Sequence, residues 1–401
     1  MKILVTGAEG FVGKNLCAAL RNIQEGKDRT HPWLEIEAVY RYDLGGTAAE
    51  LEEYCGACDF VFNLAGVNRP KEQTEYMEGN FGFATALLET LGRCGNRCPV
   101  MLSSSQQASL AGRFGDSEYG RSKRAGEELF LGYGVRTGAR VLVYRFPNLF
   151  GKWCRPNYNS AVATFCHNIA RGLPVTVSDP SVELELLYID DLVEEMLLAL
   201  VGREHRCEYR GLEAVPDAAG RYCHVPGTHR ATLGRIVELL RAYAAQPETL
   251  DIPPMPAGSF EKKLYATYLS HLPAGRVSTA LRTNADGRGS FTELLHLADC
   301  GQVSVNVSRP GVTKGQHWHH TKWEQFIVVK GRGLIRQRSL DDPEGRVLEW
   351  EVSGDRLEAV RMLPGYTHSI VNLSDSEDLV TVMYSNETFD PGHPDTYYEP
   401  V

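Results

Sequence analysis

The stretch MKILVTGAEGFVG, residues 1–13, decides the fold of the first half of this chain. A short β-branched run at residues 3–6 leads into a glycine turn, and a helical pattern begins at Val12. The glycines of the turn are Gly7, Gly10 and Gly13. They permit a tight turn, close approach of the backbone to a pyrophosphate and close helix-strand packing, while the helix N-terminus offers amide donors to phosphates. The stretch predicts a dinucleotide-binding unit.

Outward from this turn, residues 1 to about 200 alternate short strand patterns with helical patterns. The expected strands cover residues 3–6, 36–40, 59–64, 100–105 and 141–145. The expected helices cover residues 12–24, 81–92 and 121–131, with one more at 232–245 that Thr232 caps. This alternation predicts an α/β Rossmann-type fold, a doubly wound parallel sheet with helices on both faces.

The pattern changes in the second half of the chain. A proline-rich stretch at 247–256 cannot continue a helix or a central strand, so we expect a linker there, followed by a bridging helix at 260–272. Beyond residue 277, short strands are separated by Gly, Pro and Asp turns, which favours an all-β sandwich or barrel. We expect a cofactor-binding domain at 1–246, a linker with the bridging helix at 247–276 and an all-β domain at 277–401.

Length and charge agree with this division. A chain of 401 residues predicts two or three domains. Its 42 Lys and Arg stand against 51 Asp and Glu, and this acidic balance argues against the wide basic face that nucleic-acid binding needs. No stretch is apolar enough to span a membrane, and the apolar run at residues 1–7 is too short for a signal peptide. We therefore expect a cytoplasmic protein that binds neither membrane nor nucleic acid.

The cysteines are few for this length, 10 in all, and in the cytoplasm we expect reduced thiols. Cys55 with Cys58 and Cys94 with Cys98 could form a four-sulfur zinc site. We consider this the weaker interpretation, because both pairs fall among ordinary elements of the first domain.

The end of the second expected strand bears on the choice of cofactor. Arg41 stands there, and an arginine can hold the 2'-phosphate of NADP, whereas an acidic residue would bind the ribose 2'-hydroxyl of NAD. Arg41 favours NADPH, with Asp43 two residues later as the competing interpretation.

A tyrosine and a lysine follow at a spacing that suits proton transfer. Tyr119 and Lys123 are four residues apart and share one face of an expected helix. The ammonium lowers the cost of forming phenolate, so the tyrosine can move a proton near neutral pH. The fourth expected strand ends in three serines at 103–105, where a hydroxyl can hold a substrate carbonyl.

With these motifs, the first 245 or so residues resemble the extended short-chain dehydrogenase/reductase family, whose members act on nucleotide sugars. Further support comes from Asn63-Leu64-Ala65-Gly66 and from Arg145-Phe146-Pro147-Asn148-Leu149-Phe150-Gly151. The resemblance implies that Tyr119 is the proton donor and that Lys123 is its electrostatic partner and a ligand of the nicotinamide ribose. It implies that Ser105 holds the substrate carbonyl, with Ser104 as the alternative.

The same resemblance implies which residues hold the ligands. Together with Arg41 and Lys123, the cofactor residues would be Gly7, Gly10, Phe11, Val12, Gly13, Asn63, Leu64 and Ala65. The substrate residues would be Asn148 and Asn157.

Two departures from the family pattern narrow the activity. Gln106 and Gln107 stand where the family's 4,6-dehydratases carry acidic residues, so dehydration is not expected. Leu184 stands where many members have an arginine for the substrate diphosphate, so another, unidentified cation must bind it. The activities that remain possible are reduction of a keto-sugar and epimerisation.

The second half carries a cluster of metal-binding residue types. Three histidines and a glutamate stand at the fixed spacings of a metal-binding motif: His317, His319, Glu324 and His368. Three imidazoles and one carboxylate on neighbouring strands suit Zn, Mn, Fe or Ni. His317 and His319 project to the same face of a strand, whereas His320 would point away.

These spacings, including Pro364-Gly365 before His368, resemble the two cupin motifs, and cupins are jelly rolls. By this resemblance the three histidines and Glu324 are the ligands of a divalent metal, with zinc as the expected ion. Nine residues, rather than five, separate Gly354 from the Pro-Gly pair, which lengthens one hairpin without disturbing the ligands.

Reductase followed by cupin resembles the bifunctional capsular polysaccharide enzymes of the UDP-N-acetyl-L-fucosamine route. The resemblance implies that the cupin epimerises C3 of a UDP-2-acetamido-2,6-dideoxy-4-hexulose. The NADPH site would then reduce C4 to give UDP-N-acetyl-6-deoxy-L-talosamine. Epimerisation must come first, because reduction removes the carbonyl that acidifies the C3 proton. The alternative is a simple 4-keto reductase with a structural, oligomerising cupin. A homodimer is expected from both families.

Overall fold

A computed structural model describes residues 1–67, 74–281, 283–286, 289–292, 296–297, 302–342, 344–387 and 392–401. The chain packs into two compact units. The first unit comprises Met1–Leu149 and Glu185–Arg230, and the second comprises Phe150–Leu184 and Ala231–Val401. This division differs from the expected boundaries at 246 and 277, which stay a prediction.

The first unit is built on a sheet of eight strands in the order β2-β1-β3-β4-β5-β10-β8-β9. Its strands are β1 (Lys2–Thr6), β2 (Ala38–Tyr42), β3 (Phe60–Asn63), β4 (Val100–Ser105), β5 (Val141–Phe146), β8 (Arg206–Arg210), β9 (Glu213–Pro216) and β10 (Tyr222–Cys223). The first five strands pair in parallel, and β2 and β3 lie on either side of β1. The glycine turn after β1 therefore lies at the switch point of the sheet, where α/β proteins bind ligands.

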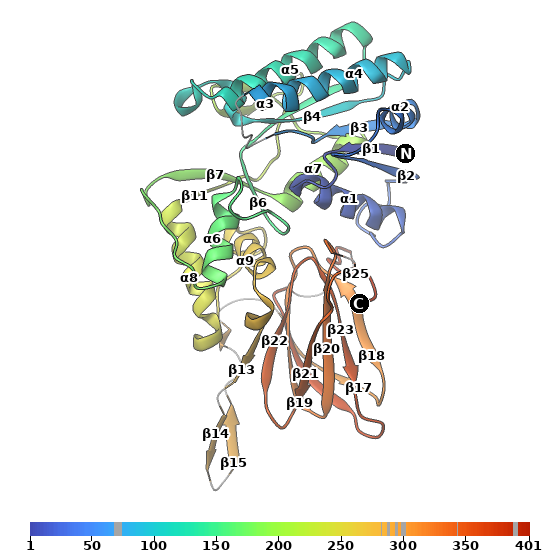
Figure 1. The fold of residues 1–401 in the computed structure, drawn as a ribbon. Coiled ribbons are helices and arrows are strands. Elements are labelled where there is room, and N and C mark those ends of the chain that lie inside the picture. Colours follow the sequence, from blue (N-terminus) through green and yellow to red (C-terminus); the bar gives the residue numbers. More distant parts are fainter. Residues whose placement is uncertain are drawn as a thin grey trace. The chain divides into compact units, whose positions relative to one another are not determined.

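Helices cover both faces of this sheet (Figure 1). They are α1 (Phe11–Gln24), α2 (Ala48–Ala57), α3 (Thr74–Met77), a π-helical turn at Glu78–Gly82, α4 (Phe83–Arg93), α5 (Glu118–Thr137) and α7 (Ile189–Leu200). In Figure 1, α4 and α5 lie on one face, and α1 and α7 lie on the other. The predicted Rossmann-type fold is confirmed. In the part of the chain described, no helix has the length and apolar character that crossing a bilayer requires.

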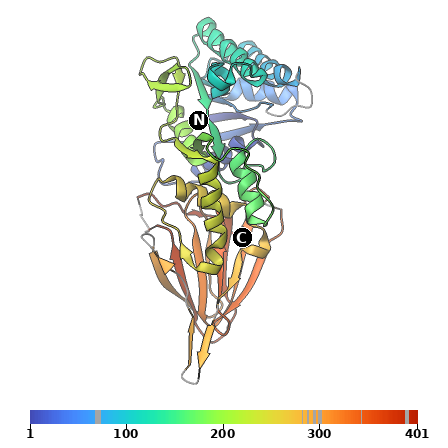
Figure 2. The same cartoon turned by 90° about the vertical axis from the view of Figure 1, so that its left-hand side faces the viewer.

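In the second unit, three helices pack on one another: α6 (Ala161–Ala170), α8 (Leu233–Thr249) and α9 (Phe260–Ser270) (Figures 1 and 2). Thr232 caps α8 as expected, because its hydroxyl accepts a hydrogen bond from the Arg235 amide. The expected break is displaced, since α8 continues through Pro247 to Thr249. Arg361 donates to the Gln246 side chain at 2.7 Å, which fixes α8 to the β-structure of this unit.

The β-structure of the second unit consists of two antiparallel five-stranded sheets (Figure 2). The first, in the order β13-β22-β19-β24-β17, contains β13 (Ser278–Ala280), β17 (Gln302–Ser308), β19 (Glu324–Lys330), β22 (Glu358–Met362) and β24 (Leu379–Ser385). The second, in the order β21-β20-β23-β18-β25, contains β18 (Thr313–Trp318), β20 (Arg332–Ser339), β21 (Leu348–Ser353), β23 (Tyr366–Asn372) and β25 (Tyr397–Tyr398). Two sheets of this kind make the predicted cupin jelly roll.

Smaller strands complete the chain. A three-stranded sheet in the order β11-β7-β6 contains β6 (Asn148–Phe150), β7 (Glu183–Tyr188) and β11 (His229–Thr232). Two short pairs join β12 (Asp251–Ile252) to β16 (His296–Leu297) and β14 (Thr283–Asp286) to β15 (Gly289–Thr292).

The predicted helix at 121–131 is longer in the structure because both of its ends are capped. The Ser117 hydroxyl accepts a hydrogen bond from the Gly120 amide, so α5 begins at Glu118. At the other end, Gly138 adopts the left-handed conformation that commonly ends a helix. The early start places Tyr119 in the first turn of α5 and Lys123 in the second.

Gly13 is the tightest point between β1 and α1. A Cβ atom at this position would lie 2.2 Å from the Gly7 carbonyl oxygen and 2.7 Å from Cα of Ala8. Both are backbone atoms, so a larger side chain would force the helix away from the turn.

We therefore predict that Gly13→Ala lowers the free energy of unfolding by about 1–3 kcal/mol, the usual cost of overpacking a core. Gly92→Ala is the matched control, because Gly92 lies in α4 and its Cβ would meet nothing within 4 Å. Alanine there should stabilise by about 0.5–1 kcal/mol. Chemical denaturation of both variants measures the difference, and equal stabilities would contradict the tight approach.

Candidate functional sites

The glycine turn has the geometry that its sequence predicts. Gly7 has φ of +69°, and a Cβ atom there would lie 2.7 Å from the Ala65 backbone nitrogen. Gly10 begins α1 without a side-chain acceptor for the first helical amides. The amides of Phe11 and Val12 can therefore be offered to a phosphate.

The end of β3 lies beside this turn. The Thr6 hydroxyl donates to Oδ1 of the buried Asn63 at 2.7 Å and accepts from the Ala65 amide at 3.4 Å. The Leu64 amide donates to the Thr6 carbonyl at 3.1 Å. The structure thus brings the predicted cofactor residues of β1 and β3 to one edge of the sheet.

Arg41 and Asp43 both contact Glu9 of the turn, but in different ways. The guanidinium of Arg41 pairs with the Glu9 carboxylate at 2.5 Å, and both side chains are at least half exposed. The Asp43 carboxylate accepts from the Glu9 amide at 2.7 Å and from the Leu44 amide at 2.7 Å. Asp43 therefore caps backbone amides, whereas Arg41 holds an exposed partner that a ligand could replace.

Tyr119 and Lys123 lie on one face of α5, as predicted. The Lys123 ammonium lies 5.7 Å from the centre of the Tyr119 ring and donates to the Ser103 carbonyl at 3.0 Å. Burial lowers the pKa of Lys123 to about 8, and the nearby Glu127 carboxylate opposes this shift. An ammonium held here favours the phenolate form of a neighbouring tyrosine.

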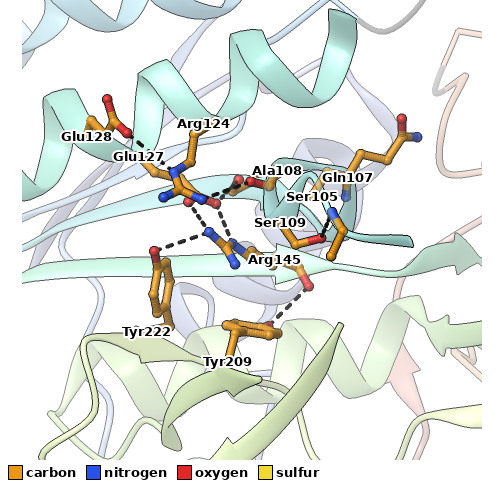
Figure 3. Close-up of polar contacts among 12 residues, drawn as sticks. Ser105, Gln107, Ala108, Ser109, Arg124, Glu127, Glu128, Arg145, Tyr209 and Tyr222 are labelled. Atoms are coloured by element: carbon orange, nitrogen blue, oxygen red, sulfur yellow. Dashed lines mark hydrogen bonds and ion pairs between the residues drawn. The ribbon is translucent and has the colours of Figure 1, made fainter. Parts of the chain in front are cut away.

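The two serines named for the carbonyl-holding role differ in their contacts. The Ser104 hydroxyl donates to the Glu127 carboxylate at 2.6 Å and is buried with it. The Ser105 oxygen accepts from the Gln107 amide at 3.2 Å, which leaves its hydroxyl hydrogen for another acceptor (Figure 3). This difference favours Ser105 over Ser104 for the substrate carbonyl.

Beneath Ser104 lies a buried ion pair. The Arg145 guanidinium donates to both oxygens of Glu127, at 2.8 and 2.6 Å, and to the Tyr222 hydroxyl at 3.1 Å. Figure 3 shows this cluster between β5, α5 and the strand that carries Tyr222. The Tyr209 and Tyr222 rings lie 5.0 and 4.4 Å from the guanidinium carbon. The pair fixes the ends of β4 and β5 that carry the candidate site.

The structure adds Glu185 to the candidate site, a residue that sequence analysis missed. Its carboxylate accepts from the Gln106 side chain at 2.6 Å, and its carbonyl accepts from the Asn148 side chain at 3.1 Å. No local motif marks Glu185, since its partner Gln106 lies 79 residues away in the sequence. Gln107 accepts from the Ser117 hydroxyl at 2.7 Å and so supports the start of α5.

Asn157, the other predicted substrate residue, belongs to the second unit. It is exposed, has φ of +55°, and its amide donates to the Thr164 hydroxyl at 3.0 Å. Its role in substrate binding stays a prediction.

The second unit gathers the four predicted metal ligands. One ligand atom from each of His317, His319, Glu324 and His368 lies within 4.8 Å of all the others. Nε2 of His319 lies 3.6 Å from the Glu324 carboxylate, and Nε2 of His368 lies 3.4 Å from it. The His320 ring instead contacts Trp318 and Tyr397, at 4.5 and 5.3 Å between ring centres, as its alternate position predicts.

Strand register explains why these side chains meet. His317 on β18 pairs directly with His368 on β23. A bulge between Gly315 and His317 turns the end of β18, and Gly315 has φ of +90°. A Cβ atom on Gly315 would lie 2.9 Å from the His368 carbonyl oxygen, so this approach requires glycine. Glu324 begins β19, across the jelly roll.

The chemistry of the cluster fits a cation. Burial, together with the neighbouring imidazoles, lowers the pKa of His317 to about 3, and burial also lowers that of His368. Although burial opposes it, contact with His319 and His368 holds the pKa of Glu324 well below its usual value. Nε2 of His319, Nε2 of His368 and one Glu324 oxygen are buried without a hydrogen-bond partner among the described residues. Such atoms suit a divalent metal.

Among the described residues, this cluster is the only group of three or more His, Cys, Asp or Glu side chains that could hold a metal ion. The cysteines do not form the four-sulfur alternative in the described structure, although Sγ of Cys58 lies 3.8 Å from Sγ of Cys98.

Two contacts of the cluster were not visible in the sequence. The nearly buried Lys322 ammonium lies 3.1 Å from the Glu324 carboxylate. The backbone carbonyl of Asp395 lies 2.5 Å from Nδ1 of His319. The first contact places a positive charge beside the candidate metal site, and the second fixes a ligand.

Family models match both halves of the chain. Residues 3–208 match the NAD dependent epimerase/dehydratase family, and residues 284–397 match the polysaccharide biosynthesis C-terminal domain.

Some relatives match along the full length of the chain, and others match only part of it. A UDP-2-acetamido-2,6-beta-L-arabino-hexul-4-ose reductase from Pseudomonas aeruginosa is 38% identical, over 99% of this chain and 98% of the relative. The crystal structure of the capsular polysaccharide assembling protein CapF from Staphylococcus aureus is 43% identical, covers 100% of both chains and superposes with a TM-score of 0.64. UDP-glucuronate 4-epimerase 1 from Arabidopsis thaliana is 28% identical, over 50% of this chain and 55% of its own length.

Proposed function

This chain belongs to the NAD dependent epimerase/dehydratase family, and we propose that it is a bifunctional UDP-sugar enzyme of capsular or O-antigen polysaccharide synthesis. Its cupin epimerises C3 of a UDP-2-acetamido-2,6-dideoxy-4-hexulose. Its first unit then reduces the C4 ketone with NADPH to give UDP-N-acetyl-6-deoxy-L-talosamine. The observation that carries the proposal is a largely buried His-Glu cluster in a chain that resembles a hexul-4-ose reductase from end to end.

The reduction uses the residues gathered at β4 and α5. NADPH supplies the hydride when it is bound. The Ser105 hydroxyl donates a hydrogen bond to the ketone oxygen, and Tyr119 delivers the proton that this oxygen needs as it becomes a hydroxyl. Lys123, 5.7 Å from the tyrosine ring, stabilises the phenolate that remains.

The epimerisation uses the acidity that the ketone gives to C3. The C4 carbonyl acidifies the C3 proton, so a base can remove it and a proton can return to the opposite face. His317, His319, Glu324 and His368 would hold a divalent cation, whose positive charge would stabilise the oxyanion of the sugar. Once C4 is reduced, C3 is no longer acidic, and this fixes the order of the two reactions.

The exposed ion pair of Arg41 supports NADPH over NADH. An exposed pair of this kind contributes about 0–1 kcal/mol, so a 2'-phosphate can replace Glu9 as the partner of Arg41 at little cost. The Asp43 carboxylate is already held by two backbone amides. We also expect a cytoplasmic homodimer.

We predict that Arg41→Ala raises KM for NADPH about 10- to 100-fold, as expected for the loss of a hydrogen bond worth about 1.5–3 kcal/mol to a charged group. KM for NADH should change less than threefold. Arg21→Ala is the control, because Arg21 is exposed near the far end of α1. Equal losses with both cofactors would contradict the 2'-phosphate role.

We predict that the two activities separate in one variant. Tyr119→Phe should lower NADPH oxidation by about 10²- to 10⁴-fold, the usual contribution of a proton donor. Its exchange of the C3 proton with solvent deuterium should persist and should stop when a chelator removes the metal. NMR of the sugar measures the exchange. Exchange that survives chelation would favour the alternative, a simple reductase with a structural cupin.

A further inference from the structure

The segment at residues 395–401 lies against the strand that carries His317. Its strand β25 pairs with β18, so that Tyr398 faces His317 and Tyr397 faces Trp318. Further along, the Glu399 amide donates to the Gln316 carbonyl at 2.9 Å. These contacts hold the segment in a fixed register beside the metal cluster.

Asp395 opens this segment and binds the turn that follows His319. Its side chain is partly buried, and its carboxylate accepts the backbone amides of His320, Thr321 and Lys322 at 2.8, 2.7 and 2.7 Å. The Thr321 hydroxyl adds a fourth contact at 3.2 Å. One side chain therefore holds three of the four residues that connect the ligands His319 and Glu324.

The backbone of the same residue contacts the ring of His319. The Asp395 carbonyl lies 2.5 Å from Nδ1 of His319, and a carbonyl can only accept, so Nδ1 must carry the proton. The other nitrogen, Nε2, is then left with its lone pair. This is the nitrogen that is buried without a hydrogen-bond partner in the described structure and lies 3.6 Å from the Glu324 carboxylate.

We propose that Asp395 is a positioning residue of the metal centre, which sets the tautomer of His319 and fixes the turn between His319 and Glu324. This inference rests on the proposed metal-dependent function of the cupin and assigns a role to a residue outside the ligand set. Partners of this kind orient a ligating histidine and keep its metal-binding nitrogen deprotonated. Their loss commonly costs about 10- to 100-fold in metal affinity.

The test uses the full-length protein, stripped of metal and titrated with Zn²⁺ against a chromogenic chelator and with Co²⁺ by absorption spectroscopy. Asp395→Ala removes all contacts of the carboxylate, and Asp395→Asn keeps the shape and one acceptor oxygen. Asp375→Asn is the matched control, because Asp375 is an exposed acidic residue of the same unit, away from the cluster. Thermal unfolding of the metal-free proteins reports the stability of the scaffold.

We expect Asp395→Ala to weaken Zn²⁺ binding about 10- to 100-fold and Asp395→Asn to weaken it less. The Co²⁺ bands of both variants should shift or lose intensity, because the position of His319 has changed, while Asp375→Asn should match the wild type. If Asp395→Ala does not fold, Asp395→Asn decides. Unchanged Zn²⁺ affinity together with unchanged Co²⁺ bands would overturn the proposal. It would also be overturned if Zn²⁺ binding weakened while the Co²⁺ bands stayed the same and the metal-free protein lost a matching amount of stability.

These outcomes are separate from those of the proposed function. Wild-type protein that binds metal with the expected dependence on Asp395, but exchanges no C3 proton, would refute the epimerase and leave the positioning role intact. If C3 exchange depends on metal in the wild type, and the Asp395 variants bind that metal as tightly as the wild type does, the positioning role alone would be refuted.

Discussion

The burial of one carboxylate among three imidazoles is the constraint on which the second half of this protein depends. Removing Glu324 from water is costly unless a positive charge compensates it, and the low pKa of His317 and His368 means that these rings are neutral near pH 7. Lys322 offers one cation at the edge of the cluster. A divalent metal would satisfy the remaining lone pairs, and the bulge in β18, the pairing of His317 with His368 and the contacts of Asp395 all serve to hold those lone pairs together.

The first half follows a different constraint, the close approach of β1 to α1 at Gly13. That approach brings the first helical amides to the edge of the sheet, where the ends of β3 and β4 also lie. The buried pair of Glu127 and Arg145 then fixes the strand ends that carry Ser105. Although the chain is acidic overall, it places single cations at the candidate site: Arg41 lies at the glycine turn, and Lys123 lies beside Tyr119.

Prediction from residue patterns succeeded where structure is local. The strand expected at 100–105 has those limits in the structure, and the four metal ligands meet as their offsets predict. It failed where tertiary packing decides. Residue spacing could not reveal that Glu185 reaches Gln106, or that Asp395 reaches a turn more than 70 residues before it. Nor did Pro247 end α8, because Gln246 is held there by Arg361 of β22.

The central claim is that two sites use one ketone in a fixed order, and deuterium at C3 tests it most directly. The protein would be given the 4-keto UDP-sugar and NADPH in D₂O, and the reduced product analysed by NMR. The account predicts deuterium at C3 in every product molecule of inverted C3 configuration, and no further exchange once C4 is reduced. A reduced product that keeps its original C3 proton and configuration would contradict it.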